Sequence, residues 1–136
     1  MLPRLLLTVA ISFYAIVVPW LELDATHVFN PAWPSHARLH EVWQLITHSA
    51  LGAVALYALW RHGAVRLAAL ATYLVTGGFL AAYALRGAYG GSMLHTDGSE
   101  RLLFGLNIGV FGFGLAILLT TLALWLDHRA QPEHIR

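Results

Sequence analysis

His36 and His40 are the two histidines whose spacing most directly suggests chemistry. They are four residues apart, so on a helix their imidazoles lie on the same face. Two imidazoles placed this way can bind one metal ion when another residue completes the site, as in helical zinc sites. The predicted cofactor is therefore a divalent metal ion of the zinc, iron or copper type. Candidates for the third ligand are His27, Asp24, His95 and Glu41.

The same stretch also suits acid–base catalysis without a metal. Histidine changes its charge near neutral pH, and a neighbouring carboxylate can orient it or share its proton. The candidate catalytic residues are His40, Glu41 and His48. A structural alternative stands beside both chemical ones: the polar side chains satisfy loop backbone groups and cap a helix where water is scarce. The residues alone leave all three alternatives open.

Polar residues continue the face of His36 and His40 into the apolar run that follows. This stripe consists of Trp43, Gln44, Thr47 and, at its edge, His48. Because polar groups are costly against lipid, we expect the stripe to face the interior of a helix bundle. Asn107 is expected about one and a half turns inside the last span, as its deep partner. The candidate ligand-binding residues are Asn30, Trp33, Trp43, Gln44 and Asn107.

The composition predicts an all-α integral membrane protein, a four-helix bundle in contact with membrane lipids. Hydrophobic residues make up 58% of the chain and charged residues only 11%, which is too apolar for an ordinary soluble domain. The net charge of +1 provides no basic patch for nucleic acid. Cysteine is absent, so disulfides, thiolate metal ligands and thiol nucleophiles are excluded.

The apolar runs divide one transmembrane domain, residues 1–136, into four predicted spans. They cover about residues 4–21, 41–60, 64–85 and 102–126, and the long loops are residues 22–40 and 86–101. The first run could be a signal peptide, but bulky and acidic residues follow it where a cleavage site needs small ones. We therefore expect a retained span. Gly105 and Gly109 form a G-x-x-x-G pair that is expected to let the last span pack closely.

The first long loop is expected to be rich in turns. Asn30 precedes Pro31 and Trp33 precedes Pro34, and a residue before proline is disfavoured in a helix. A helix can begin at about Ser35. Asn30 is also expected to bond its own backbone two residues later.

Arginine counting predicts the orientation, because cytoplasmic segments are enriched in Lys and Arg. The side with both termini and the short turn holds Arg4, Arg61, Arg66, Arg129 and Arg136. The side with the long loops holds Arg38, Arg86 and Arg101. We therefore expect cytoplasmic termini, with the histidine-rich loop on the external, periplasmic or lumenal side.

The run ATHVFNPAWPSHARLH resembles a family of small four-span membrane proteins of fungi and bacteria. Members have a similar Thr-His, Asn-Pro, Trp-Pro and His-x-x-x-His pattern between their first two spans. The resemblance covers about residues 24–40. It implies a four-helix fold and a shared site at His27, Asn30, His36 and His40, but no substrate.

Two functions are consistent with these observations. The first is a His/carboxylate pocket at the non-cytoplasmic end that binds or transforms a lipophilic small molecule, such as a lipid, quinone or terpenoid, with or without a metal. The second is a non-catalytic membrane subunit whose polar loop docks a partner protein. The first requires His36 and His40 to converge inward, and the second requires them on an exposed surface with Trp33 and Phe29.

Overall fold

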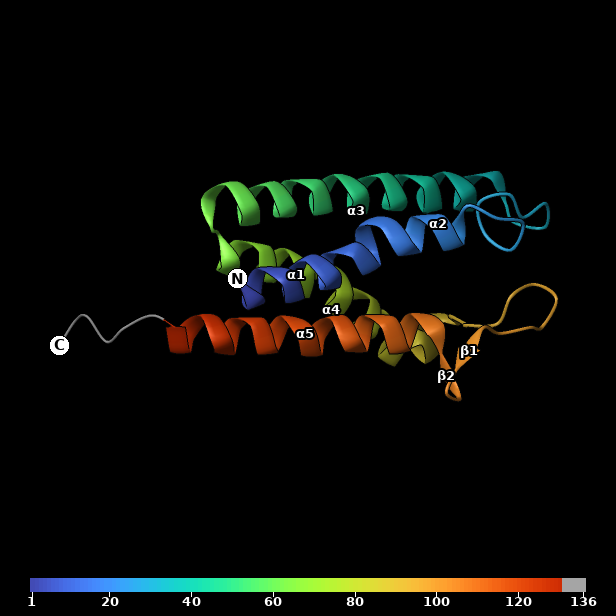
Figure 1. Ribbon diagram of the computed structural model, residues 1–136. Coiled ribbons are helices and arrows are strands. Elements are labelled where there is room, and N and C mark those ends of the chain that lie inside the picture. The colour runs from blue at the N-terminus through green and yellow to red at the C-terminus, as the bar shows by residue number, and fades with distance from the viewer. Residues whose placement is uncertain (131–136) are drawn as a thin grey trace.

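The computed structural model describes residues 1–130 and has four long helices that run side by side (Figure 1). The elements are α1 (Leu2–Ser12), a π-helical turn η1 (Phe13–Val17), α2 (Val18–Glu22), α3 (Ser35–His62), α4 (Val65–Tyr89), β1 (Leu102–Leu103), β2 (Leu106–Asn107) and α5 (Ile108–Ala130). Because α1, η1 and α2 are continuous, residues 1–130 contain four helices long and apolar enough to span a membrane. The predicted all-α membrane bundle is confirmed, and the chain is an integral membrane protein.

The helix of α1, η1 and α2 is central to the bundle. It packs against α3, α4 and α5, while α3 and α5 lie on opposite sides of it (Figure 1). The long loops that follow α2 and α4 lie at the same end of the bundle (Figure 1). The opposite end has the start of α1, the end of α5 and the short turn at Gly63, which adopts a left-handed conformation with φ 66°.

The π-helical turn has a clear cause in Pro19. Proline has no N–H to donate to the carbonyl four residues earlier, here Ala15, and its ring crowds that oxygen. A π-helical turn, η1, widens the helix at this point. The Ser49 hydroxyl of α3 donates a hydrogen bond of 2.9 Å to the Ala15 carbonyl. A neighbouring helix thus supplies a donor that proline removes, as apolar surroundings require.

Gly52 allows α3 to approach η1 closely. A Cβ at this position would lie 2.3 Å from the Cβ of Ala15, so only glycine fits. Contact between Gly52 and η1 fixes which face of α3 turns inward: the buried positions Leu45, Gly52, Ala55 and Leu59 lie on one side of that helix.

The buried threonine hydroxyls form hydrogen bonds within their own helices. Thr72, Thr76 and Thr120 are fully buried. Each donates its hydroxyl to the carbonyl four residues earlier, at 2.9, 2.7 and 2.7 Å respectively. They therefore add polar atoms to the core without leaving a donor unpaired.

The start of the fourth span is the main correction to the predicted boundaries. Residues 102–107 form a β-hairpin, and α5 begins only at Ile108. Phe104 and Gly105 form its turn with positive φ values of 53° and 79°, as a two-residue hairpin of this type requires. Gly105 therefore lies in a turn, so the predicted packing pair of Gly105 and Gly109 in one span is wrong. The third helix also continues to Tyr89, beyond the predicted end at residue 85.

Exposed tryptophans mark two levels along the bundle. Trp20 and Trp43 lie towards the loop end, and Trp60 and Trp125 lie towards the other end. Trp43 and Trp60 are separated by about 26 Å along α3, at 1.5 Å per residue. This is close to the ~30 Å thickness of a bilayer core, and tryptophan is enriched at both interfaces. The hydrocarbon region therefore lies between these levels.

Replacing Gly52 with alanine is expected to destabilise the bundle by about 1–3 kcal/mol, the usual range for overpacked sites. The new methyl group would meet Ala15 Cβ, which is fixed to the backbone and cannot rotate away. Unfolding of the detergent-purified protein measures the effect. Gly77→Ala is the matched control, because its Cβ would meet no atom within 4 Å. Equal stability of Gly52→Ala and the unmodified protein would contradict this packing.

Candidate functional site

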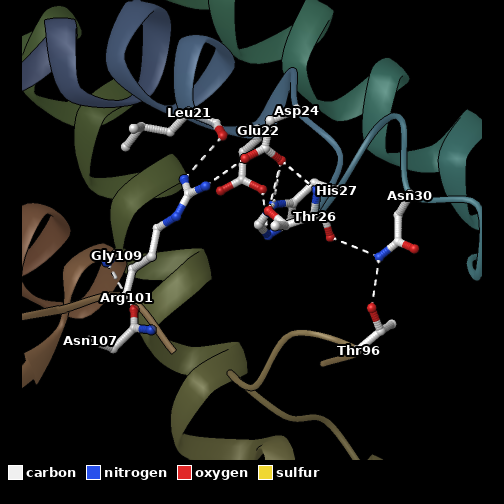
Figure 2. Close-up of polar contacts among 10 residues, drawn as sticks. All are labelled: Leu21, Glu22, Asp24, Thr26, His27, Asn30, Thr96, Arg101, Asn107 and Gly109. Atoms are coloured by element: carbon white, nitrogen blue, oxygen red, sulfur yellow. Dashed lines mark hydrogen bonds and ion pairs between the residues drawn. The ribbon is translucent and has the colours of Figure 1, made fainter. Parts of the chain in front are cut away.

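A continuous chain of polar contacts joins the two long loops where they meet at the end of the bundle (Figure 2). His27 Nε2 lies 2.7 Å from a Glu22 oxygen, and His27 Nδ1 lies 2.8 Å from the Thr26 hydroxyl. That hydroxyl donates to Asp24 Oδ1 at 2.7 Å. Arg101, from the other loop, donates to Asp24 Oδ2 at 2.5 Å. We call these five residues the loop cluster.

The hydrogen bonds bear on the charge of His27. The Thr26 hydroxyl contacts both Asp24 Oδ1 and His27 Nδ1, and when its single proton is donated to Asp24, His27 Nδ1 donates to the hydroxyl oxygen. His27 Nε2 faces a carboxylate, which accepts when ionised. Together with the raised pKa of His27, these contacts favour two donor ring nitrogens and a protonated ring.

The pKa shifts have matching physical causes. The hydrogen bond to Glu22 outweighs partial burial and, with Asp24, raises the pKa of His27 above its ordinary value. Partial burial would raise the pKa of Asp24, but hydrogen bonds from Thr26 and the contact with Arg101 outweigh it. They hold the pKa of Asp24 well below its usual range.

Asn30 connects the same two loops a few ångströms away. It is 2% exposed, and its Nδ2 donates to the Thr26 carbonyl at 3.0 Å and to the Thr96 hydroxyl at 3.3 Å. Its Oδ1 accepts the N–H of Ala32 at 3.0 Å, so the predicted bond to its own backbone is confirmed. Asn30 was a ligand-binding candidate, but these contacts make it a loop-positioning residue.

His95 lies beside His27 and has an unused polar atom. The two rings meet edge to face with centroids 5.1 Å apart, and Trp33 contacts His27 in the same way at 5.6 Å. The buried Nε2 of His95 has no hydrogen-bond partner among residues 1–130. Buried nitrogens are nearly always paired in folded proteins, so this atom is available to a ligand.

Glu41 and His48 lie on the inward side of α3, and both are half-buried. Glu41 lies close enough to Glu22 and His27 to interact electrostatically with both. His48 is two turns deeper and contacts the ring of Tyr14 edge to face, with centroids 6.3 Å apart. Of the three catalytic candidates, Glu41 therefore adjoins the loop cluster, His48 lies below it, and His40 does not share their face.

The prediction of an inward polar stripe is wrong except for His48 at its edge, which faces inward. The outward-facing residues are His36, His40, Trp43, Gln44 and Thr47, all exposed. His36 and His40 therefore do not converge on an interior pocket, which was the arrangement expected for the pocket function. The cost of exposure was overestimated, because α3 has 28 residues and is about 42 Å long. It exceeds the ~30 Å bilayer core, so its first turns, with His36 and His40, extend beyond hydrocarbon. This reason does not apply to Gln44 and Thr47, which lie below the level of Trp43.

Asn107 is not the deep partner that the sequence suggested. It lies in β2, directly before α5, and its Oδ1 accepts the N–H groups of Gly109 and Val110 at 2.8 and 3.3 Å. Its Nδ2 donates to Glu100 at 3.1 Å. Asn107 is therefore the N-cap of α5, satisfying backbone donors that begin every helix.

The five metal-ligand candidates fall into two separate groups. His36 and His40 contact each other on the outer face of α3. Asp24, His27 and His95 meet at the loops, where Asp24 and His27 are engaged with other residues. Over residues 1–130, no group of three or more His, Cys, Asp or Glu side chains is placed to hold a metal ion.

Four residues of these loop contacts are absent from the candidate site residues predicted from the sequence: Glu22, Thr26, Thr96 and Arg101. A signal existed for the ion pair, because a carboxylate close to hydrocarbon requires a cation at the same membrane level. Asp24 and Arg101 are both at the loop end of the predicted topology. Thr26 and Thr96 had no comparable signal, since hydroxyl partners depend on the exact path of the loops.

The fold and the loop cluster define a class of protein: a four-helix integral membrane protein whose two loops are joined by a histidine–carboxylate–arginine network at one membrane surface. The chain matches no protein-family model, and no curated protein or solved structure matches it either.

The loop cluster should make stability depend on pH in a defined direction. Because the folded-state pKa of His27 is above its unfolded value of 6.5, its stabilising contribution is fully present below that value. It is lost as pH rises through the folded-state pKa. Melting temperatures measured in detergent from about pH 6 to about pH 9 should therefore fall more in the unmodified protein than in His27→Gln. His62→Gln, at the exposed far end of α3, should follow the unmodified protein, and parallel profiles for all three would contradict the assignment.

Proposed function

We propose that this membrane protein binds a lipophilic small molecule whose polar head, a hydroxyl or carbonyl group, enters the loop cluster beside His27 and His95. A lipid, a quinone and a terpenoid all have this chemistry. The observation that carries the proposal is the buried His95 Nε2, which has no hydrogen-bond partner among residues 1–130. It adjoins the His27 ring, with centroids 5.1 Å apart, at the loop end of the bundle.

The protonation state of the loop cluster supports this role. When protonated, His27 has two N–H donors, one of which faces Glu22 at 2.7 Å. A ligand oxygen that takes the place of Glu22 would receive a hydrogen bond from a cation, the stronger class of hydrogen bond. Glu22 and Glu41 are then the nearby carboxylates that could accept a proton, so the same residues could also act in proton transfer.

The surroundings also suit an amphipathic molecule. Trp33 contacts the His27 ring, and aromatic side chains with few polar groups are typical of ligand sites. Trp20, 77% exposed at the end of α2, marks the same membrane level. A molecule at this level could keep its apolar part in the bilayer and its head group in the loop cluster.

Photolabelling tests the proposal. The probes are photoactivatable analogues of a quinone, a diacyl phospholipid and a terpenoid alcohol, applied to the detergent-purified protein. At least one should label the loops around His27 and His95, with competition by its unlabelled parent. His27→Ala and His95→Ala should each reduce this labelling about tenfold, since a hydrogen bond to a charged group contributes ~1.5–3 kcal/mol.

His62→Ala is the control and should label as the unmodified protein does, because His62 contacts Tyr57 at the opposite end of α3. Labelling that is unchanged in His27→Ala and His95→Ala would contradict the proposal. So would labelling confined to the lipid-facing middle of the helices.

A second candidate function is a non-catalytic subunit that docks a partner protein. It is favoured by the exposed outer face at the start of α3, where Leu39 and Trp43 are 65% and 63% exposed and His36 contacts His40. Phe29, in the preceding loop, is 64% exposed. Aromatic residues surrounded by polar ones are typical of interfaces. On this alternative, substitutions on that face would impair assembly while the His27 and His95 variants would leave it intact.

We also propose cytoplasmic termini, with the loop cluster on the external, periplasmic or lumenal side. The support is the arginine distribution, although Arg136 lies outside the described residues. Reporter fusions at Gly63 and after the last residue should read cytoplasmic, and a fusion at Gly91 should read external. A periplasmic signal from either of the first two would contradict this orientation.

The resemblance to the family of small four-span proteins is also retained as a proposal. Of its four implied site residues, His27 and Asn30 belong to the joined loops, and His36 and His40 lie on the outer face of α3. On this proposal, members of that family should need both the loop pair, His27 and Asn30, and the helix pair, His36 and His40, for their function.

A further inference from the structure

His36 and His40 form a close pair on the outer surface of the first turns of α3. Their Nε2 atoms are 3.0 Å apart, and the rings meet edge to face with centroids 4.5 Å apart at 82°. Both side chains are exposed. The pair is separate from the loop cluster, in which His27 contacts Trp33 and His95.

The distance between these two nitrogens suits a shared metal ion. Imidazole nitrogens bind zinc at ~2.0–2.1 Å, so two of them on one ion lie roughly 2.8–3.4 Å apart for bond angles from about 90° to tetrahedral. The observed separation of 3.0 Å falls within this range. An ion bound to both nitrogens would lie to one side of the line that joins them, so the distance fits and the exposed rings would turn towards the ion.

Protonation does not oppose this exchange. When two neutral imidazoles share a hydrogen bond, one Nε2 carries the proton and the other offers its lone pair. If the donor ring moves that proton to its Nδ1, both Nε2 atoms have a lone pair free for an ion. Each ring remains neutral, so metal binding needs a change of tautomer but no net loss of a proton.

The position of the pair makes it accessible to ions from water. His36 and His40 precede Trp43, which lies at the loop-end membrane level, and the first turns of α3 extend beyond the hydrocarbon region. The two side chains leave the remaining coordination positions of an ion open to water or to an external ligand.

We propose that His36 and His40 form a surface site for a divalent transition-metal ion, with two protein ligands and open positions. This site is independent of ligand binding at the loop cluster. Imidazole nitrogens bind copper, nickel and zinc ions. A given site of this kind usually binds Cu²⁺ more tightly than either Ni²⁺ or Zn²⁺. The order of affinity among added ions should therefore be copper first.

The test is titration of the detergent-purified protein, prepared without a histidine tag, with Cu²⁺, Ni²⁺ and Zn²⁺ added alone. One site should be tightest for Cu²⁺. His36→Ala and His40→Ala should each weaken that site at least about tenfold, a loss comparable with changes around known metal sites. The double variant should lack the site, whereas His62→Ala should keep it.

Electron paramagnetic resonance of the protein with one equivalent of Cu²⁺ gives a second readout. The unmodified protein should show two coordinated imidazole nitrogens, and each single variant should show one. Both side chains are exposed, so the variants should retain the melting temperature of the unmodified protein. His40→Gln removes the imidazole while keeping a side chain of similar size, and it should also show one coordinated imidazole nitrogen. Equal binding by the double variant, or loss of the site in His62→Ala, would overturn the proposal.

Discussion

The contact between α3 and the π-helical turn controls much of this structure. Pro19 leaves the Ala15 carbonyl without its usual partner, Ser49 donates to it, and Gly52 permits the approach. In an apolar environment neither an unpaired carbonyl nor a steric overlap can be relieved by water. The contact therefore sets the rotation of α3 about its axis. That rotation turns Glu41 towards the loops and leaves His40 on the outside.

A second constraint acts at the membrane surface, where charged groups must be paired close to hydrocarbon. Asp24 accepts from Thr26 in its own loop and from Arg101 in the other. Its two oxygens thus connect residues distant in the chain, and Asn30 adds a second connection to Thr96. The loops hold His27 and His95 together because these contacts leave them little freedom. The polar network therefore contributes to structure as well as to the proposed ligand site.

The histidines consequently divide into groups with different chemistry. His27 is half-buried and contacts other residues through both ring nitrogens. This suits donation to an oxygen atom but not metal binding, because coordination needs a free lone pair. His36 and His40 are exposed, and their nitrogens face each other, which suits an ion. The sequence motif that contains all three thus serves two surfaces, since the chain changes direction between His27 and the start of α3.

The sequence by itself determined the class of the protein. Four long apolar runs require helices that span a bilayer, because only these satisfy every backbone group in lipid, and Pro31 and Pro34 required a turn-rich first loop. It also indicated that Asp24, His27 and His95 could lie close together, and the structure brings His27 and His95 into contact. Only the tertiary structure decided which face of α3 is inward, because both faces follow the same helical period and Gly52 selects between them. It also showed that residues 102–107 form a hairpin, which apolar composition does not distinguish from the end of a helix. The ion pair of Arg101 with Asp24 was likewise decided by the tertiary structure, because long-range pairing depends on how the loops meet.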